Sequence, residues 1–219
     1  MSTPNLKSAF FRAANPSGTP AIYIETPRLI LREHEAGDVD RIHQISQSPN
    51  FFYYCFDGSR QKAEDFVNEA LRTQSLNPAT GMRDNHMVAV VRKDTNELIG
   101  HACIEKINYI PGVDYEPNYF LDPAHQGGGL GQETLVNIVN FAFAGLELPA
   151  MTSTQHPDNK VALHVAQTKI GFRNIPCADV NINTAAGVQP RLLSIVWPKD
   201  FYELRKNDKM AFIAPHLNP

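Results

Sequence analysis

Apolar and polar positions change their period several times along the chain, which predicts strands and helices in alternation. A first strand is expected over 22–32, with a break at Thr26-Pro27. Later strands are expected over 87–91, 98–107, 115–122, 150–155 and 191–197. Apolar residues spaced by three and four predict helices that follow Asp38 and Ser59, two residues able to cap a helix N-terminus. A polar connection is expected over 172–190, with a helical turn after Trp197.

Residues 119–143 hold the most informative pattern. A strand ends at Pro123, and four glycines follow within the next few positions, at 127, 128, 129 and 131. A helical apolar face then runs from Leu135 to Phe143. The amides of a first helical turn have no intrahelical partner, and the helix dipole adds partial positive charge there. A strand, a glycine loop and a helix in this order predict an anion site, and a diphosphate suits it best.

Composition narrows the classes of partner. The 219 residues are 42% hydrophobic and 20% charged, with a formal net charge of −3, so a single globular domain without a broad basic face is expected. We therefore expect no nucleic-acid partner and no membrane partner. Cys55, Cys103 and Cys177 form no C-x-x-C pair, which favours a reduced cytoplasm and no metal site. Residues 1–20 and 207–219 are expected to be tails around a domain at 21–206.

Four motifs in order resemble the GNAT superfamily of N-acetyltransferases. Gln126-x-x-Gly129-x-Gly131 looks like its acyl-CoA loop, whereas the Walker pattern fails and the dinucleotide pattern fits only in part. Residues 25–32, Glu-Thr-Pro-Arg-Leu-Ile-Leu-Arg, resemble the opening of the branch that includes the ribosomal-protein alanine N-acetyltransferases. Residues 98–100 resemble the family's Leu-Ile-Gly. Residues 156–172 resemble its last motif helix, although the spacing from Asn159 to Gly171 is one residue longer, which predicts a bulge or an offset helix start.

The resemblance implies a fold and a cosubstrate. The expected fold is a single α/β domain with a mixed, largely antiparallel sheet flanked by helices, and the expected cosubstrate is acetyl-CoA. In the family the strand before the loop splays from its neighbour, so that free backbone groups pair with the pantetheine arm. The residues expected to bind the cofactor are Phe120, Leu121, Gln126, Gly127, Gly128, Gly129, Leu130, Gly131, Gln132 and Asn159.

Three residues are candidates for catalysis. Glu116 stands where the family has a glutamate on this strand, and it is the first candidate for a base, although a solvated strand glutamate is an equal alternative. A backbone amide at Tyr119 is expected to bind the thioester oxygen. Gln167 replaces the family's proton-donating tyrosine, and His164, one turn earlier, is a candidate substitute.

The acceptor is less defined than the donor. A primary amine is expected, either a protein N-terminus or a small molecule, with residues 50–58 and 172–190 shaping its pocket. The sequence is compatible with a homodimer. Because Gln167 carries no hydroxyl, a non-catalytic acyl-CoA-binding or sensor domain is the main alternative, and a nucleotide enzyme is a weaker one.

Overall fold

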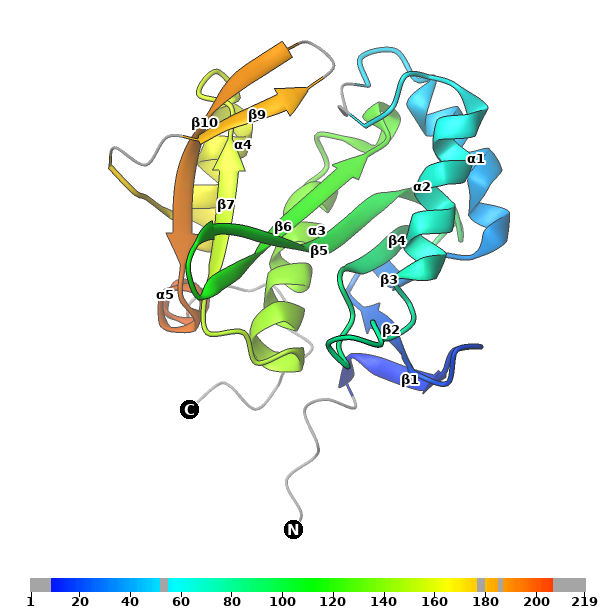
Figure 1. Ribbon diagram of the computed structural model, residues 1–219. Helices are drawn as coiled ribbons and strands as arrows, with labels where there is room; N and C mark the ends of the chain where they lie inside the picture. Colours follow the sequence, from blue (N-terminus) through cyan, green and yellow to red (C-terminus); the bar gives the residue numbers. More distant parts are fainter. Residues whose placement is uncertain (1–8, 52–54, 177–179, 185–186, 207–219) are drawn as a thin grey trace.

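The strands of the protein form two sheets, seen in a computed structural model that describes residues 9–51, 55–176, 180–184 and 187–206 (Figure 1). The larger sheet has six antiparallel strands in chain order. Its strands are β1 (Phe11–Ala14), β2 (Pro20–Glu25), β3 (Leu29–Glu33), β4 (His86–Arg92), β5 (Leu98–Ile110) and β6 (Val113–Leu121).

The smaller sheet follows in the sequence and is built around its last strand. Its members are β7 (Met151–Gln155), β8 (Arg173–Asn174), β9 (Val180–Thr184) and β10 (Gly187–Val196), and β10 pairs with each of the others. The helices are α1 (Val39–Ser46), α2 (Arg60–Arg72), α3 (Leu130–Asn140), α4 (Lys160–His164) and α5 (Pro198–Arg205). Among the residues described, no helix has the length and apolarity needed to span a bilayer.

Helices cover the two faces of the larger sheet and divide the core into two layers. α1 and α2 pack against one face through Ile42, Ile45 and Val67, together with the strand residues Ala89 and Phe120. α3 packs against the other face, where it shares a cluster with the opposite-facing residues of β2, β3 and β4. Because both faces of β4 are covered, all but the last of its residues are buried. The predicted mixed and largely antiparallel α/β fold is confirmed.

β6 and β7 lie next to each other without a backbone ladder. They run in the same direction, as the connection through α3 requires (Figure 1). The hydrogen bonds between them involve side chains. Thr152 Oγ1 donates to the carbonyl of Tyr115 at 3.3 Å, and the amide and hydroxyl of Thr154 donate to the carboxylate of Glu116. The two strands are therefore splayed, as the family resemblance implied.

The N-terminal part of the sheet differs from the expectation. Residues 22–32 form a hairpin of β2 and β3, because the chain turns at Thr26, whose Oγ1 accepts from the Leu29 amide at 2.9 Å. The segment expected to be an N-terminal tail contains β1, which pairs with β2, and Phe10 is fully buried against Phe141. The described sheet thus begins at Phe11, ahead of the boundary expected at residue 21. The expected C-terminal tail lies outside the described residues.

The region expected to be a polar connection at 172–190 contains β8, β9 and the start of β10 instead. Several of its described residues are exposed and polar, so the alternation that marks a half-buried strand is absent from the sequence. In contrast, the extra residue between Asn159 and Gly171 is explained. Residues 165–170 form a π-helical turn, closed by a bond from the Gly171 amide to the Ala166 carbonyl at 3.0 Å.

Asp38 precedes α1 as predicted, but its carboxylate does not cap the helix. It accepts two bonds from Arg32, at 2.8 and 2.9 Å, and lies 3.1 Å from Nδ1 of His34. The other ring nitrogen of His34 lies 3.0 Å from Nδ1 of His101 on β5. This buried polar chain ties β3 to β5 beneath the aromatic rings of Phe66 and Phe120.

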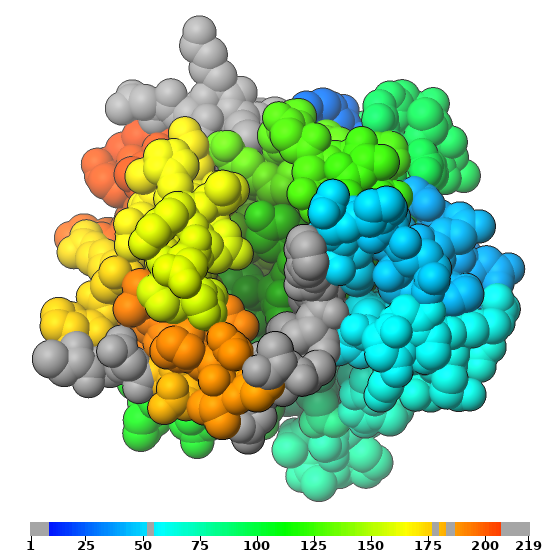
Figure 2. Space-filling view, turned by 90° about the horizontal axis from the view of Figure 1, so that it is seen from above, coloured from blue at the N-terminus to red at the C-terminus, as the bar shows by residue number. Residues whose placement is uncertain are grey.

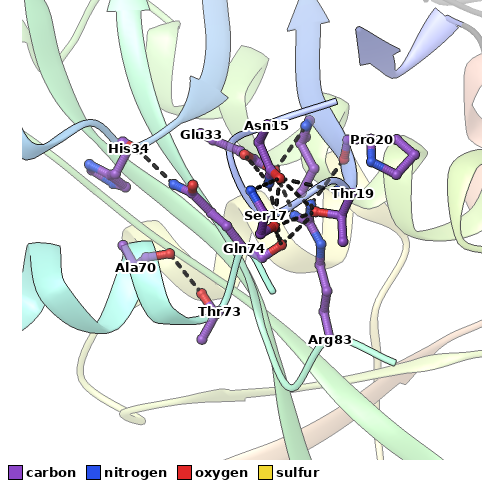
Figure 3. A network of polar contacts seen from close by, with 11 residues as sticks. Asn15, Ser17, Thr19, Pro20, Glu33, His34, Ala70, Thr73, Gln74 and Arg83 are labelled. Atoms are coloured by element: carbon purple, nitrogen blue, oxygen red, sulfur yellow. Dashed lines mark hydrogen bonds and ion pairs between the residues drawn. The ribbon is translucent and has the colours of Figure 1, made fainter. Parts of the chain in front are cut away.

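A buried ion pair holds the N-terminal hairpin to the rest of the domain (Figure 3). Arg83 Nη1 donates to Glu33 at 2.6 Å, and both side chains are less than one-tenth exposed, at 7% and 8%. Arg83 Nη2 also donates to Thr19 Oγ1 and to the Pro20 carbonyl, while Asn15 donates to the other oxygen of Glu33. Every strong donor around the pair has a partner, so removal of one charge would leave the other buried and unpaired.

We expect Arg83→Leu to lower the free energy of unfolding by about 3 kcal/mol or more, because Glu33 would remain buried without its cation. Arg72→Leu is the matched control, since Arg72 is 58% exposed and pairs with Glu69 on the helix surface. Its loss should cost much less, because an exposed ion pair is solvated and contributes little to stability. Urea titrations of both variants and the wild type at pH 7 measure the difference. Equal losses in the two variants would contradict the role given to Arg83.

Candidate functional site

The glycine loop takes a conformation that other residues would resist. Gly127 and Gly129 have φ angles of 86° and 78°, in the left-handed region that side chains disfavour. Gly131 serves a different purpose, because a Cβ atom there would lie 3.1 Å from the ring of Tyr119. The loop leads directly into α3, so the first-turn amides of the helix, at Leu130, Gly131 and Gln132, open toward it.

A buried glutamate of α3 holds the hairpin turn of β2 and β3 against this loop. Glu133 is 4% exposed, and its carboxylate accepts from Thr26 Oγ1 at 2.6 Å, from the Arg28 amide at 2.9 Å and from Arg28 Nε at 2.7 Å. Arg28 Nη1 in turn donates to the Gly128 carbonyl at 2.8 Å. The Thr-Pro-Arg segment recognised in the sequence therefore fixes the carbonyl of the loop's second glycine. Glu133 itself was missed.

Gln126 was predicted to bind a diphosphate, and its amide group donates to the Leu121 carbonyl at 3.0 Å. This bond holds the end of β6 to the start of the loop. The Arg28 and Gly128 side of the loop lines a shallow pocket of about 320 Å³ together with Arg92 and Lys93. Both cations are paired there, with Asp94 and Glu25 respectively.

The open edge of β6 presents backbone amides toward β7. The Asp122 amide donates to the Ile99 carbonyl on the β5 side at 2.8 Å. Since amide directions alternate along a strand, the amides of Tyr119 and Leu121 point to the opposite side, where β7 is splayed away. Pro117 has no amide to offer. Phe120 was predicted to bind the cofactor, but its amide faces β5 and its ring packs under α1 and α2.

Glu116 on β6 bridges to Thr154 on β7 across the splay between the two strands. Its Oε1 accepts from the Thr154 amide at 2.7 Å and from Thr154 Oγ1 at 2.9 Å. Burial raises the pKa of the Glu116 carboxyl to about 7, against these two bonds, which favour the ionised form. Glu105 lies directly opposite on β5, and its negative charge raises the pKa of Glu116 further. Glu116 is therefore a partly buried carboxyl with a pKa near neutral pH.

Glu116, Asn118 and Phe120 share the face of β6 that looks toward α1 and α2, because alternate residues of a strand point to one side. On this face Phe120 contacts the rings of Phe51 and Phe56 at centroid distances of 5.3 and 5.7 Å. Part of the aromatic segment 50–58 thus packs against the core beside the row that contains Glu116, and residues 52–54 lie outside the described part. Figure 2 shows a hollow between the rim of β7, α4 and β10 and the rim of α1 and α2.

The remaining predicted residues lie at α4, and Gln167 lies in the π-helical turn at 165–170 that follows it. Asn159 caps this helix, since its Oδ1 accepts from the Ala162 amide at 3.0 Å. His164 is exposed, and its Nε2 lies 3.4 Å from Thr168 Oγ1. Gln167 donates to the side chain of Asn174 at 3.2 Å. Among the described contacts none joins His164 to Glu116 or Tyr119, so the structure brings Glu116 and the open β6 edge together and leaves His164 apart.

Comparison with known proteins identifies the family to which this arrangement is similar. A sequence profile of the acetyltransferase (GNAT) domain matches residues 28–173. An uncharacterised N-acetyltransferase of Bacillus subtilis, YnaD, is 27% identical over 155 residues, which cover 69% of this chain and 83% of that protein. The N-alpha-acetyltransferase RimI of Mycobacterium tuberculosis is 29% identical over 92 residues, which cover 42% of this chain and 54% of that protein.

The fold is also similar to solved structures. The spermidine N-acetyltransferase of Vibrio cholerae in complex with CoA and spermine superposes with a TM-score of 0.61 at 20% identity, over 80% of this chain and 98% of that one. At this level of identity the likeness concerns the fold.

We expect Glu116→Gln to stabilise the protein increasingly as pH rises from 5 to 8. The folded carboxyl has a pKa of about 7 and the unfolded one a pKa near 4.5, so the folded state holds the extra proton between them. The stability from this proton is complete below pH 4.5 and is lost as pH rises through 7. The glutamine cannot ionise and keeps an oxygen for Thr154. Urea unfolding at several pH values, with the surface variant Glu64→Gln as control, measures the trend, and a pH-independent difference would refute it.

Proposed function

The chain belongs to the GNAT family of acetyltransferases, and on that premise we propose that it transfers the acetyl group of acetyl-CoA to a primary amine by direct attack in a ternary complex. The observation that carries the proposal is the juxtaposition of three features: the glycine loop, the open edge of β6, and Glu116 between β6 and β7. Together they offer a place for an anion, free amides for a polar chain, and a base beside both.

The loop and its supports fit the donor. The first-turn amides of α3 would bind the diphosphate of acetyl-CoA, and Arg28 and Glu133 hold the loop in the required shape. The pantetheine arm would then lie in the splay, where the amides of Tyr119 and Leu121 are open. The Tyr119 amide is the nearer of these to Glu116 along β6, so it is the donor we assign to the thioester oxygen.

Glu116 is assigned the role of base, acting directly or through a water molecule. It removes a proton from the acceptor ammonium, and the nitrogen lone pair attacks the thioester carbon. The tetrahedral intermediate then collapses: the carbon–sulfur bond breaks, its electron pair stays on sulfur, and the acylated nitrogen loses its second proton to solvent to give the amide. A base with a pKa of about 7 is suited to neutral pH, because it combines a useful ionised fraction with the highest basicity that pH allows.

The leaving thiolate receives little help from the described residues of α4 and of the π-helical turn that follows it. Gln167 has no hydroxyl and is bonded to Asn174, and His164 is exposed. A thiol with a pKa near 8.5 can leave as the thiolate and take its proton from solvent. The same observation supports the second candidate, a domain that binds acyl-CoA without turnover. A thiol-release assay with acetyl-CoA and a panel of amines separates the two, because a sensor would bind acetyl-CoA and release no CoA with any amine.

Membership of the family supports a primary amine as the acceptor and does not narrow its class further. The opening Glu-Thr-Pro-Arg motif favours the branch that acetylates the N-termini of ribosomal proteins, and one relative is named an N-alpha-acetyltransferase. The fold is also similar to that of a spermidine N-acetyltransferase. Both a protein N-terminus and a small amine are therefore retained as acceptors, and the amine panel includes both.

We expect Glu116→Gln to lower kcat by about 10²-fold or more, because the variant cannot take the proton of the ammonium. Acetyl-CoA affinity, measured by calorimetry, should be close to that of the wild type. The wild-type kcat/KM should rise through an apparent pKa near 7, and the variant should lose this limb. Glu64→Gln is the matched control, since it removes a carboxylate on the surface of α2 and leaves the proposed base untouched. An unchanged turnover of Glu116→Gln between pH 6 and 9 would exclude Glu116 as the base.

We expect Arg28→Met to raise the Kd for acetyl-CoA by about tenfold, because the Gly128 carbonyl and the loop lose their charge-assisted restraint. At saturating acetyl-CoA kcat should be retained, since the reacting groups are untouched. Arg60→Met on the exposed face of α2 serves as control. An equal change in both variants, or a loss confined to kcat, would argue against the role given to Arg28.

A further inference from the structure

Arg191 on β10 points to the face of the smaller sheet that carries Thr154. In the ladder between β7 and β10, Leu193 lies opposite Thr154, and Arg191 is two residues before Leu193, so the three side chains lie on one side. Thr154 on this side bonds to Glu116. β10, drawn in orange, forms part of the rim of the hollow in Figure 2. Arg191 therefore stands across the splay from the proposed base.

The guanidinium of Arg191 has no hydrogen bond or ion pair with any described residue. Its Nε is buried and lacks an acceptor. Its positive charge lowers the pKa of the Glu116 carboxyl and of the Tyr109 hydroxyl, although burial raises both by more. The charge is thus close to both groups, while no nitrogen of Arg191 is within 4.0 Å of a carboxylate oxygen in the described chain. Oε1 of Glu116 instead accepts hydrogen bonds from the amide and the hydroxyl of Thr154.

The buried Nε of Arg191, beside the hollow, is costly unless something binds to it. Buried donors without acceptors lose their hydration and gain nothing in return. The comparison with Arg83, which is also largely buried, is direct, because Arg83 bonds to Glu33, Thr19 and Pro20. The planar guanidinium presents its donors in a fork that matches a carboxylate.

We infer that Arg191 binds a carboxylate carried by the acceptor, so that the acceptor is an amine of the amino-acid class. This rests on the proposed function and deepens it. The amine would lie near Glu116, and the carboxylate would reach across to Arg191. Arg191 is a cation that acts on Glu116, and the carboxylate of Glu105 opposes Glu116 from β5, so a monoanion suits the site better than a phosphate with two charges.

The test compares L-amino acids with their carboxamides, using acetyl-CoA and the full chain. The readout is kcat/KM for the acid divided by kcat/KM for the amide, compared between the variant and the wild type. The ratio in a single enzyme is not informative, because the amino groups of the acid and the amide differ in pKa. We expect Arg191→Gln to lower kcat/KM for the acids by about tenfold or more and to leave the amides near the wild-type value. For the acids, kcat/KM of Arg191→Lys should lie between that of Arg191→Gln and that of the wild type. Arg173→Gln, which removes an exposed arginine of β8 from the same sheet, should change neither.

Three outcomes would overturn the inference. Equal losses for acids and amides in Arg191→Gln, with unchanged acetyl-CoA affinity, would give Arg191 a role unrelated to the carboxylate. Faster turnover of amidated peptides than of free amino acids would identify a protein N-terminus as the acceptor. In both cases acetylated product still forms, so the proposed function survives. Thiol release with none of the amines would remove the proposed function and the inference together.

Discussion

The structure depends on a separation between two parallel strands. β6 and β7 touch through Thr152, Thr154 and Glu116, but they do not pair along their backbones, and buried amides without partners are normally excluded from proteins. The surrounding framework maintains this separation. β6 is paired along its other edge with β5, and β7 along its other edge with β10. The opening follows because each strand is already committed to a different sheet, and a ligand with a polar chain can use the amides that remain.

The parts of this arrangement that the sequence predicts are those determined by near neighbours. The strand before Pro123, the glycine loop and α3 follow from local periodicity and turn chemistry, and so does the Ser59 cap of α2, where the Lys62 amide donates to Ser59 Oγ at 3.3 Å. Partners far apart in sequence were missed. Thr154 and Glu116 are 38 positions apart, and Arg28 and Glu133 are 105 apart. No pattern along one segment reveals such pairs, because each residue alone looks like an ordinary polar residue of a strand or a helix.

The electrostatics of the site are set by a contrast between paired and unpaired charged side chains. Arg28, Arg41 and Arg83 are each held by carboxylates, and their role is to fix the backbone around the loop and the hairpin. Around the hollow the pattern changes. Glu116 and Glu105 face each other, and burial raises the pKa of both. These three arginines are thus bonded within the fold, whereas Arg191 beside the splay has a buried Nε without an acceptor.

The π-helical turn at 165–170 has a consequence for how related chains are compared. It absorbs one residue inside the helix and still delivers Gly171 and Phe172 to their places, with the Phe172 amide bonded to the same Ala166 carbonyl as Gly171. An alignment that treats this helix as a continuous α-helix will shift every residue on one side of the turn by one position. It would then assign the place of Gln167, where the family has its proton-donating tyrosine, to a neighbour. The gap belongs within the π-helical turn, where the backbone itself records the insertion.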